Sequence, residues 1–192
     1  MSDTEQPSWA PLVGGPAIWV VMAVEVVTFG LFLTYHASSW AGQVDVYRAS
    51  QLQLHPTSAV LGTVLLLTGS WTAYLAAVAC EEGKSRAGGG WLLATAGFGA
   101  LFSANKLLEY SHLDGVGLST NGFWFTYLFL TGLHLLHVLA GVVAYGWLGG
   151  LAFAGRGTEG EDLLNVQAAA VYWHLVDVVW LLLFPILYLM HP

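Results

Sequence analysis

The sequence predicts an all-α integral membrane protein built as a bundle of five transmembrane helices. Two observations lead to this prediction. Hydrophobic residues make up 56% of the 192 residues and charged residues only 9%, against about 25% charged residues in soluble domains. The charges are also spaced so that five long stretches carry one charge or none, and a membrane-spanning helix needs ~20 such residues. An ordinary soluble globular domain is therefore excluded.

The helices are expected at residues of about 16–37, 57–80, 88–110, 122–153 and 164–190. They form one membrane domain over residues 16–192, preceded by a polar tail over residues 1–15 and joined by short loops. Pro16 and Pro56 stand where a first helical turn tolerates a missing N–H group. Asn121 can cap the fourth helix, and Thr158 with Glu161 fits a capping box before the fifth.

The basic residues of the loops predict the orientation. Lys84, Arg86 and Arg156 lie on the side of the N-terminus, whereas Arg48 and Lys106 lie on the other. Because cytoplasmic loops carry the excess of Lys and Arg, the N-terminus is expected in the cytoplasm.

Composition also limits the partners and the chemistry. The chain has five Lys and Arg residues and a net charge of −7, which offers no surface for neutralising phosphates, so no nucleic acid partner is expected. A single cysteine, Cys80, excludes an intrachain disulfide and any all-cysteine metal cluster.

Polar residues inside the apolar stretches are the candidates for function. Glu25 lies about nine residues into the first helix, ~14 Å along its axis, where an unpaired carboxylate is costly. Three further helices carry polar stripes at helical spacing: Asn105, Glu109 and His112; Tyr127, Thr131, His134 and His137; Gln167, His174 and Asp177. Because polar groups in membrane helices face the bundle interior, these stripes are expected to converge.

Four interpretations of these residues compete. A haem would need His174 opposite His134 or His137, because two histidines three apart on one helix cannot reach opposite faces of one ring. A non-haem metal could use the three histidines with a carboxylate, although no Glu-x-x-His pair is present. Glu25 or Glu109 could form a proton or water path. Interhelical hydrogen bonds explain the histidines and Asp177 more simply, whereas the single mid-membrane carboxyl of Glu25 favours function.

Two motifs resemble a known family. Residues 131–141 read TGLHLLHVLAG and resemble the T-G-x-H-x-x-H-V signature of cytochrome c oxidase subunit III. Residues 172–181 read YWHLVDVVWL, followed by Phe184-Pro185, and resemble the Y-W-H-x-V-D-x-V-W ending of that family. Glu25 and the Glu109-Tyr110 pair fall where the family has a buried glutamate and an E-Y pair. The resemblance covers nearly the whole chain.

The resemblance is to the short, five-helix bacterial form of the family. Residues 118–121, leading into residues 123–131, most resemble the accessory protein encoded with nitric oxide reductase, with the quinol oxidase and cytochrome c oxidase subunits III as close relatives.

The resemblance implies a non-catalytic subunit of the bacterial inner membrane, without haem, copper or another cofactor. Its implied partners are a catalytic haem-copper subunit and a phospholipid held in a cleft, and its implied role is to support proton uptake and the durability of the enzyme. The implied polar network comprises Glu25, Glu109, His134, His137, His174 and Asp177. The implied lipid cleft involves Tyr172, Trp173 and His134. The alternative is a free-standing membrane redox or metal protein that uses His134, His137 and His174.

Overall fold

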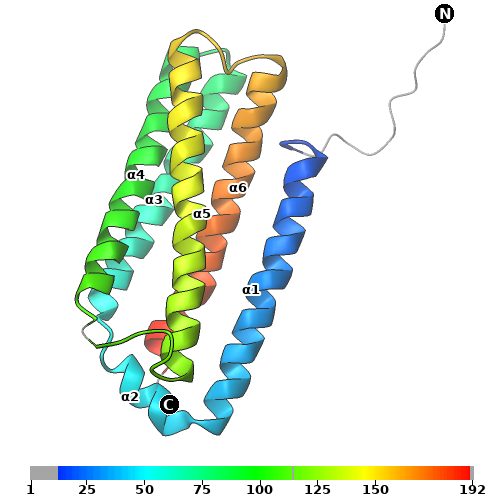
Figure 1. Cartoon of the computed structure of the whole chain (residues 1–192). Coiled ribbons are helices and arrows are strands. Elements are labelled where there is room, and N and C mark those ends of the chain that lie inside the picture. The colour runs from blue at the N-terminus through cyan, green and yellow to red at the C-terminus, as the bar shows by residue number, and fades with distance from the viewer. Residues whose placement is uncertain (1–12, 114, 191–192) are drawn as a thin grey trace, which may run out of the picture.

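The computed structural model describes residues 13–113 and 115–190 (Figure 1). These residues form helices and no strand: α1 (Pro16–Gly42), α2 (Val44–Gln51), α3 (Pro56–Glu81), α4 (Ser85–Ser111), α5 (Gly122–Phe153), α6 (Gly160–Phe184) and the π-helical turn η1 (Pro185–Leu189). Five helices are long and apolar enough to cross a membrane: α1, α3, α4, α5, and α6 continued by η1. The predicted fold class is therefore confirmed.

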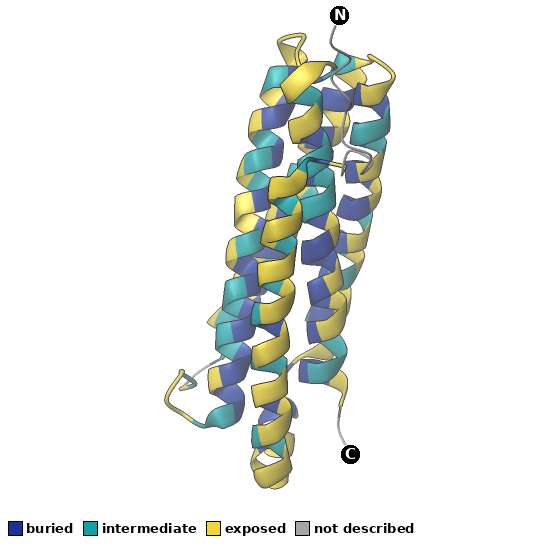
Figure 2. Cartoon of the chain, turned by 90° about the vertical axis from the view of Figure 1, so that its right-hand side faces the viewer, coloured by how far each residue is buried: buried dark blue, intermediate teal, exposed yellow. Residues whose placement is uncertain are grey.

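Helices α3 to α6 pack into a four-helix bundle, and α1 runs beside α5 and α6 at its edge (Figure 1). In α1 only Phe29 and His36 are buried, and exposed residues follow almost its whole length (Figure 2). The α3–α4 and α5–α6 loops lie at the same end of the bundle as the start of α1, whereas α2 and the α4–α5 loop lie at the other end.

The core of the bundle packs around Trp173 of α6, which has no exposed surface. Glycines of three neighbouring helices face its indole ring: Gly69 of α3, Gly99 of α4 and Gly141 of α5. A Cβ atom added at Gly141 would lie 2.9 Å from Trp173 Cζ3. The glycines therefore let the helices approach an aromatic side chain that a larger residue would displace.

Two of the expected helix ends are wrong. The first long helix continues to Gly42 instead of ending near residue 37, and the expected loop before the second contains α2. The last long helix begins at Gly160 with Glu159 as its N-cap and no side-chain capping bond, so the predicted capping box does not form. Arg156 instead donates two hydrogen bonds to Asp162, of 2.7 and 3.0 Å, in the first turn, where an acidic side chain is favoured by the helix dipole.

Other helix ends follow the sequence. Pro16 and Pro56 begin α1 and α3. Asn121 caps α5, because its side chain accepts a hydrogen bond of 3.0 Å from the backbone N–H of Trp124. The same side chain donates to Ser50 Oγ at 3.1 Å, which ties α2 to the start of α5.

Candidate functional site

One polar contact joins α1 to α5. His137 Nε2 lies 3.1 Å from Glu25 Oε1, and the two side chains are about one-fifth exposed, 20% and 18%. The other ring nitrogen of His137, Nδ1, lies 2.8 Å from the carbonyl oxygen of Leu133. Glu25 therefore meets a histidine whose orientation is set by its own helix.

His134, one turn earlier on α5, is 1% exposed. Its ring stacks on Trp180, with a centroid distance of 5.3 Å and an interplanar angle of 26°, and meets the edge of Phe102. Within the described residues neither of its ring nitrogens has a hydrogen-bond partner. His134 is thus held by aromatic packing and forms no direct hydrogen bond to Glu25 or His137.

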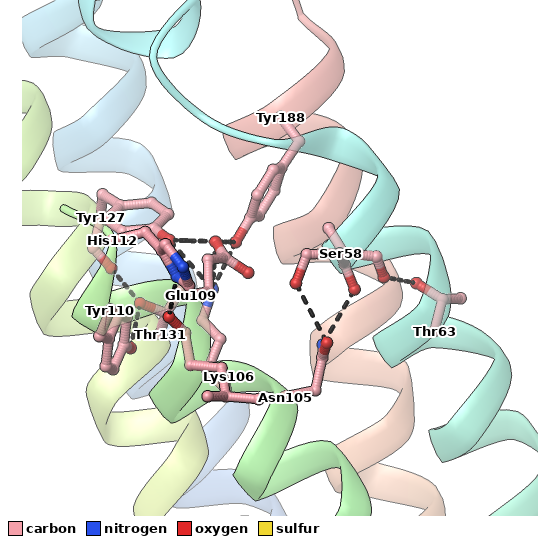
Figure 3. Close-up of polar contacts among 12 residues, drawn as sticks. Ser58, Thr63, Asn105, Lys106, Glu109, Tyr110, His112, Tyr127, Thr131 and Tyr188 are labelled. Carbon is pink, nitrogen blue, oxygen red and sulfur yellow. Dashed lines mark hydrogen bonds and ion pairs between the residues drawn. The ribbon is translucent and has the colours of Figure 1, made fainter.

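Glu109 belongs to a second, separate cluster on α4. Its Oε1 atom accepts hydrogen bonds from Lys106 Nζ at 3.1 Å, Tyr127 Oη at 2.5 Å and Tyr188 Oη at 2.6 Å (Figure 3). Lys106 is 1% exposed and Glu109 7% exposed. Lys106 Nζ also donates to both tyrosine hydroxyls and lies 4.9 to 5.4 Å from the centroids of four aromatic rings.

From the sequence, Lys106 was only a marker of orientation, and Tyr188 was not among the expected site residues. The signal for the ion pair was present, because Lys106 and Glu109 are three residues apart on one helix and so lie on one face. Tyr188 had no such signal, since it reaches the pair through η1. A π-helical turn changes which residues share a helix face. This turn begins at Pro185, which lacks the N–H group that a regular helix donates to the carbonyl four residues earlier.

His174 and Asp177 of α6 point in different directions. Asp177 is buried and accepts a hydrogen bond of 2.9 Å from Ser70 Oγ of α3. His174 is exposed, and its Nδ1 atom lies 2.7 Å from the carbonyl oxygen of Ala170 in its own helix. The expected convergence of the polar stripes is therefore met only in part: Tyr127 of α5 meets Glu109 of α4, whereas His174 lies outside the polar contacts of the bundle.

The described residues contain no group of three or more His, Cys, Asp or Glu side chains arranged to hold a metal ion. In particular, His174 does not join His134 and His137, because its ring lies on the outer surface of α6. The three-histidine cluster of the alternative interpretation is not assembled.

Tyr172 and Trp173, the other expected cleft residues, occupy different surroundings. Tyr172 Oη donates a hydrogen bond of 3.0 Å to the carbonyl oxygen of His137 and lines a groove between α1 and the α5–α6 pair. Trp173 is turned into the bundle core. The groove has a volume of ≈ 410 Å³, and its lining is mostly apolar: Ile18, Ala140, Ala144, Trp147, Leu148, Asn165, Ala168, Ala169 and Tyr172.

The family is decided by comparison with known proteins. The sequence model of the family described as "Cytochrome c oxidase subunit III" matches residues 13–191, which includes every helix of the structure. The chain belongs to this family. Both motif segments that carried the resemblance lie on helices that pack against each other, α5 and α6.

Individual members of the subunit III family show the same relationship. The chain is 30% identical to the cytochrome bo(3) ubiquinol oxidase subunit 3 of Pseudomonas putida over 179 residues, covering 90% of this chain and 83% of the relative. It is also 30% identical to the quinol oxidase subunit 3 of Bacillus subtilis, covering 90% and 84%. A protein of Aeropyrum pernix named "Heme-copper oxidase subunit I+III" is 31% identical over 180 residues, covering 90% of this chain and 22% of that longer relative.

As a subunit III with five long apolar helices, the chain is a multi-pass membrane protein and an accessory subunit of the haem-copper oxidase type. The polar contacts described above therefore lie inside a membrane-embedded bundle, where each unsatisfied or unpaired group is costly.

Proposed function

We propose that the chain is a non-catalytic subunit that docks in the membrane on a catalytic haem-copper subunit and supports its turnover. The observation that carries this proposal is the family match over residues 13–191. The Aeropyrum relative, whose name joins subunits I and III in one chain, supports the choice of partner, because fused subunits are held beside each other. On this proposal the chain itself binds no haem or metal, and electron transfer takes place in the partner.

Co-purification tests the docking. The tagged full-length chain, extracted from native membranes in a mild detergent, should migrate with a haem-containing subunit and with its Soret absorbance. The chain separated from that complex should show neither a Soret band nor stoichiometric metal. A chain that always migrates alone would reject the docking, and a haem or metal bound to the isolated chain would favour the redox alternative.

The groove between α1 and the α5–α6 pair is the proposed phospholipid site. It is mostly apolar and open at the edge of the bundle, and acyl chains bind such surfaces by burial of apolar area. Ala144→Phe would fill it, whereas Val143→Phe changes a neighbouring residue that is 72% exposed and does not line it. Lipid retained by the purified complex, measured by mass spectrometry, should fall in the first variant and not in the second.

The proposed membrane is the bacterial inner membrane, with the N-terminus in the cytoplasm. Lys84, Arg86 and Arg156 support this orientation, because the α3–α4 loop, the first turn of α4 and the α5–α6 loop lie at the same end as the start of α1 (Figure 1). A cysteine-labelling experiment with a membrane-impermeant reagent tests it: Ser85→Cys should be protected in intact cells, whereas Ser119→Cys should react. The reverse pattern would invert the proposed topology.

The finer assignment, an accessory protein of nitric oxide reductase, rests on residues 118–131 alone. The catalytic subunit that co-purifies decides it. Recovery with a nitric oxide reductase would support this assignment, and recovery with an oxygen-reducing oxidase would replace it without affecting the broader proposal.

We also propose that Glu25 takes part in proton uptake by the assembled enzyme, in contact with His137. The carboxyl group lies within a candidate membrane span and contacts an imidazole ring, a group that can accept or donate a proton near neutral pH. Glu25→Gln keeps the shape and a hydrogen-bond donor but removes the titrating group. Slower proton uptake or a shorter turnover lifetime would support a functional role, and unchanged values of both would leave the pair a packing contact.

A further inference from the structure

A small cavity lies between α1, α5 and α6, next to the Glu25–His137 contact. Its polar walls are the side chains of Glu25, His134 and His137, and its apolar walls are Phe29, Leu175, Val176 and Val179. Its volume is ≈ 10 Å³, about the minimum that one water molecule requires. The cavity is too small for a lipid chain or a metal ion with its ligands.

Unsatisfied polar atoms surround this cavity. Glu25 Oε2 and both ring nitrogens of His134 are buried, and none has a hydrogen-bond partner among the described residues. A neutral imidazole ring has one donor and one acceptor, and a carboxyl oxygen has two acceptor sites. Buried polar groups in proteins are nearly always paired, and where no protein group is in reach an ordered water takes that place.

The alternative, a dry cavity, is typical of sites lined only by apolar side chains. Here Glu25 Oε2 and the ring nitrogens of His134, on different helices, would remain without a hydrogen bond in a membrane interior. The stacking of His134 on Trp180 fixes its ring, so it cannot rotate to find another partner without losing that contact.

We propose that this cavity binds one water molecule, which bridges Glu25 Oε2 and a ring nitrogen of His134. The water extends the Glu25–His137 contact into a chain of four groups, from His137 through Glu25 and the water to His134. Beyond His134 the chain meets the rings of Phe102 and Trp180. The bridged unit therefore ends at His134 and does not continue across the bundle.

The inference does not depend on which catalytic subunit the chain docks on, and its test is independent of proton uptake. The assembled complex is imaged by cryo-electron microscopy at a resolution that shows ordered water. In parallel, the infrared band of the Glu25 carboxyl group is assigned by its loss in Glu25→Gln. Density for one water between Glu25 and His134 is expected in the wild type.

Val179→Leu provides the decisive variant, because it fills the cavity from an apolar wall without removing a polar group. Val178→Leu is the matched control, since Val178 is the neighbouring residue, is 52% exposed and does not line the cavity. The water density should vanish and the Glu25 band should shift in Val179→Leu and in His134→Phe, with the wild-type spectrum kept in Val178→Leu. Absence of the water in the wild type, or a Glu25 band that is unchanged in Val179→Leu, would overturn the inference.

Discussion

The carboxyl group of Glu25 and the imidazole ring of His137 share one proton. His137 Nδ1 lies 2.8 Å from the carbonyl oxygen of Leu133, so Nδ1 must carry a hydrogen atom. The 3.1 Å contact between Nε2 and Glu25 Oε1 then requires a proton on one of these two atoms. The pair is either a carboxylate with an imidazolium ring or a carboxylic acid with a neutral ring. Both forms carry no net charge, which suits a membrane interior.

Removing the imidazole group should therefore lower the stability of the fold. His137→Phe keeps an aromatic side chain but leaves the Glu25 carboxyl without its partner, and we expect a loss of about 1–3 kcal/mol in the free energy of unfolding. Thermal unfolding of the purified protein in detergent measures it. His112→Phe is the control, because His112 makes the same bond to its own helix, at 2.6 Å from Leu108 O, on an exposed surface. Equal losses in the two variants would contradict the pairing.

Breaking the Lys106–Glu109 pair should lower the free energy of unfolding by more, because both side chains are nearly fully buried. Lys106→Met removes the charge that faces Glu109 and leaves a buried carboxylate, at an expected cost of about 3–5 kcal/mol. The double variant Lys106→Met with Glu109→Gln removes both charges and should recover a large part of this loss.

Denaturant unfolding of the single and double variants gives the coupling between the two residues. Lys84→Met serves as the control, since Lys84 pairs with Glu82 at 2.6 Å on the surface, with side chains 65% and 52% exposed, and such pairs contribute little. Additive effects of the two buried substitutions would show that Lys106 and Glu109 act independently.

Much of the fold was predictable from the sequence because its signals are local. Uncharged stretches predicted the five spans, and Asn121 before an apolar run predicted the start of α5. α2 was missed: it is an eight-residue helix with mixed polarity, and segments of this length carry little periodicity.

The site was predictable only in part, for a physical reason. Helical spacing shows which residues share a face, but it does not show which neighbouring helix covers that face. Glu25 and His137 were singled out and are in contact, whereas His174 was placed in the same network and lies on the outer surface. The surroundings of each polar residue depend on helix packing. That packing is determined by glycines and aromatic side chains that are distant from the polar residue in the sequence.

The packing around Trp173 gives a third prediction. Gly141→Ala would place a Cβ atom 2.9 Å from Trp173 Cζ3, which forces the indole ring or α5 to shift at an expected cost of about 1–3 kcal/mol. Gly146→Ala lies on the same helix with nothing within 4 Å of the added atom, and it should be neutral or stabilising by up to about 1 kcal/mol. The melting temperatures of the two variants measure this difference. A stabilising Gly141→Ala would show that α5 does not pack closely on Trp173.

The last prediction concerns the contact between α2 and the start of α5. Asn121→Ala removes both the 3.0 Å capping bond to Trp124 N and the 3.1 Å bond to Ser50 Oγ, and loss of a cap costs about 1 kcal/mol. Asn121→Asp keeps the acceptor for the cap but loses the donor to Ser50. Because the two bonds lie on different atoms, the aspartate variant should keep the stability of α5 while α2 loosens.

Hydrogen exchange measured by mass spectrometry separates the two effects. Exchange in residues 44–51 should rise in both variants, whereas exchange at the first turn of α5 should rise only in Asn121→Ala. Asn165→Ala is the control, as Asn165 is exposed and lies elsewhere, on α6. If α2 exchanges at the wild-type rate in both Asn121 variants, the helix is held by its buried Tyr47 and Gln51 side chains and the Ser50 contact contributes nothing.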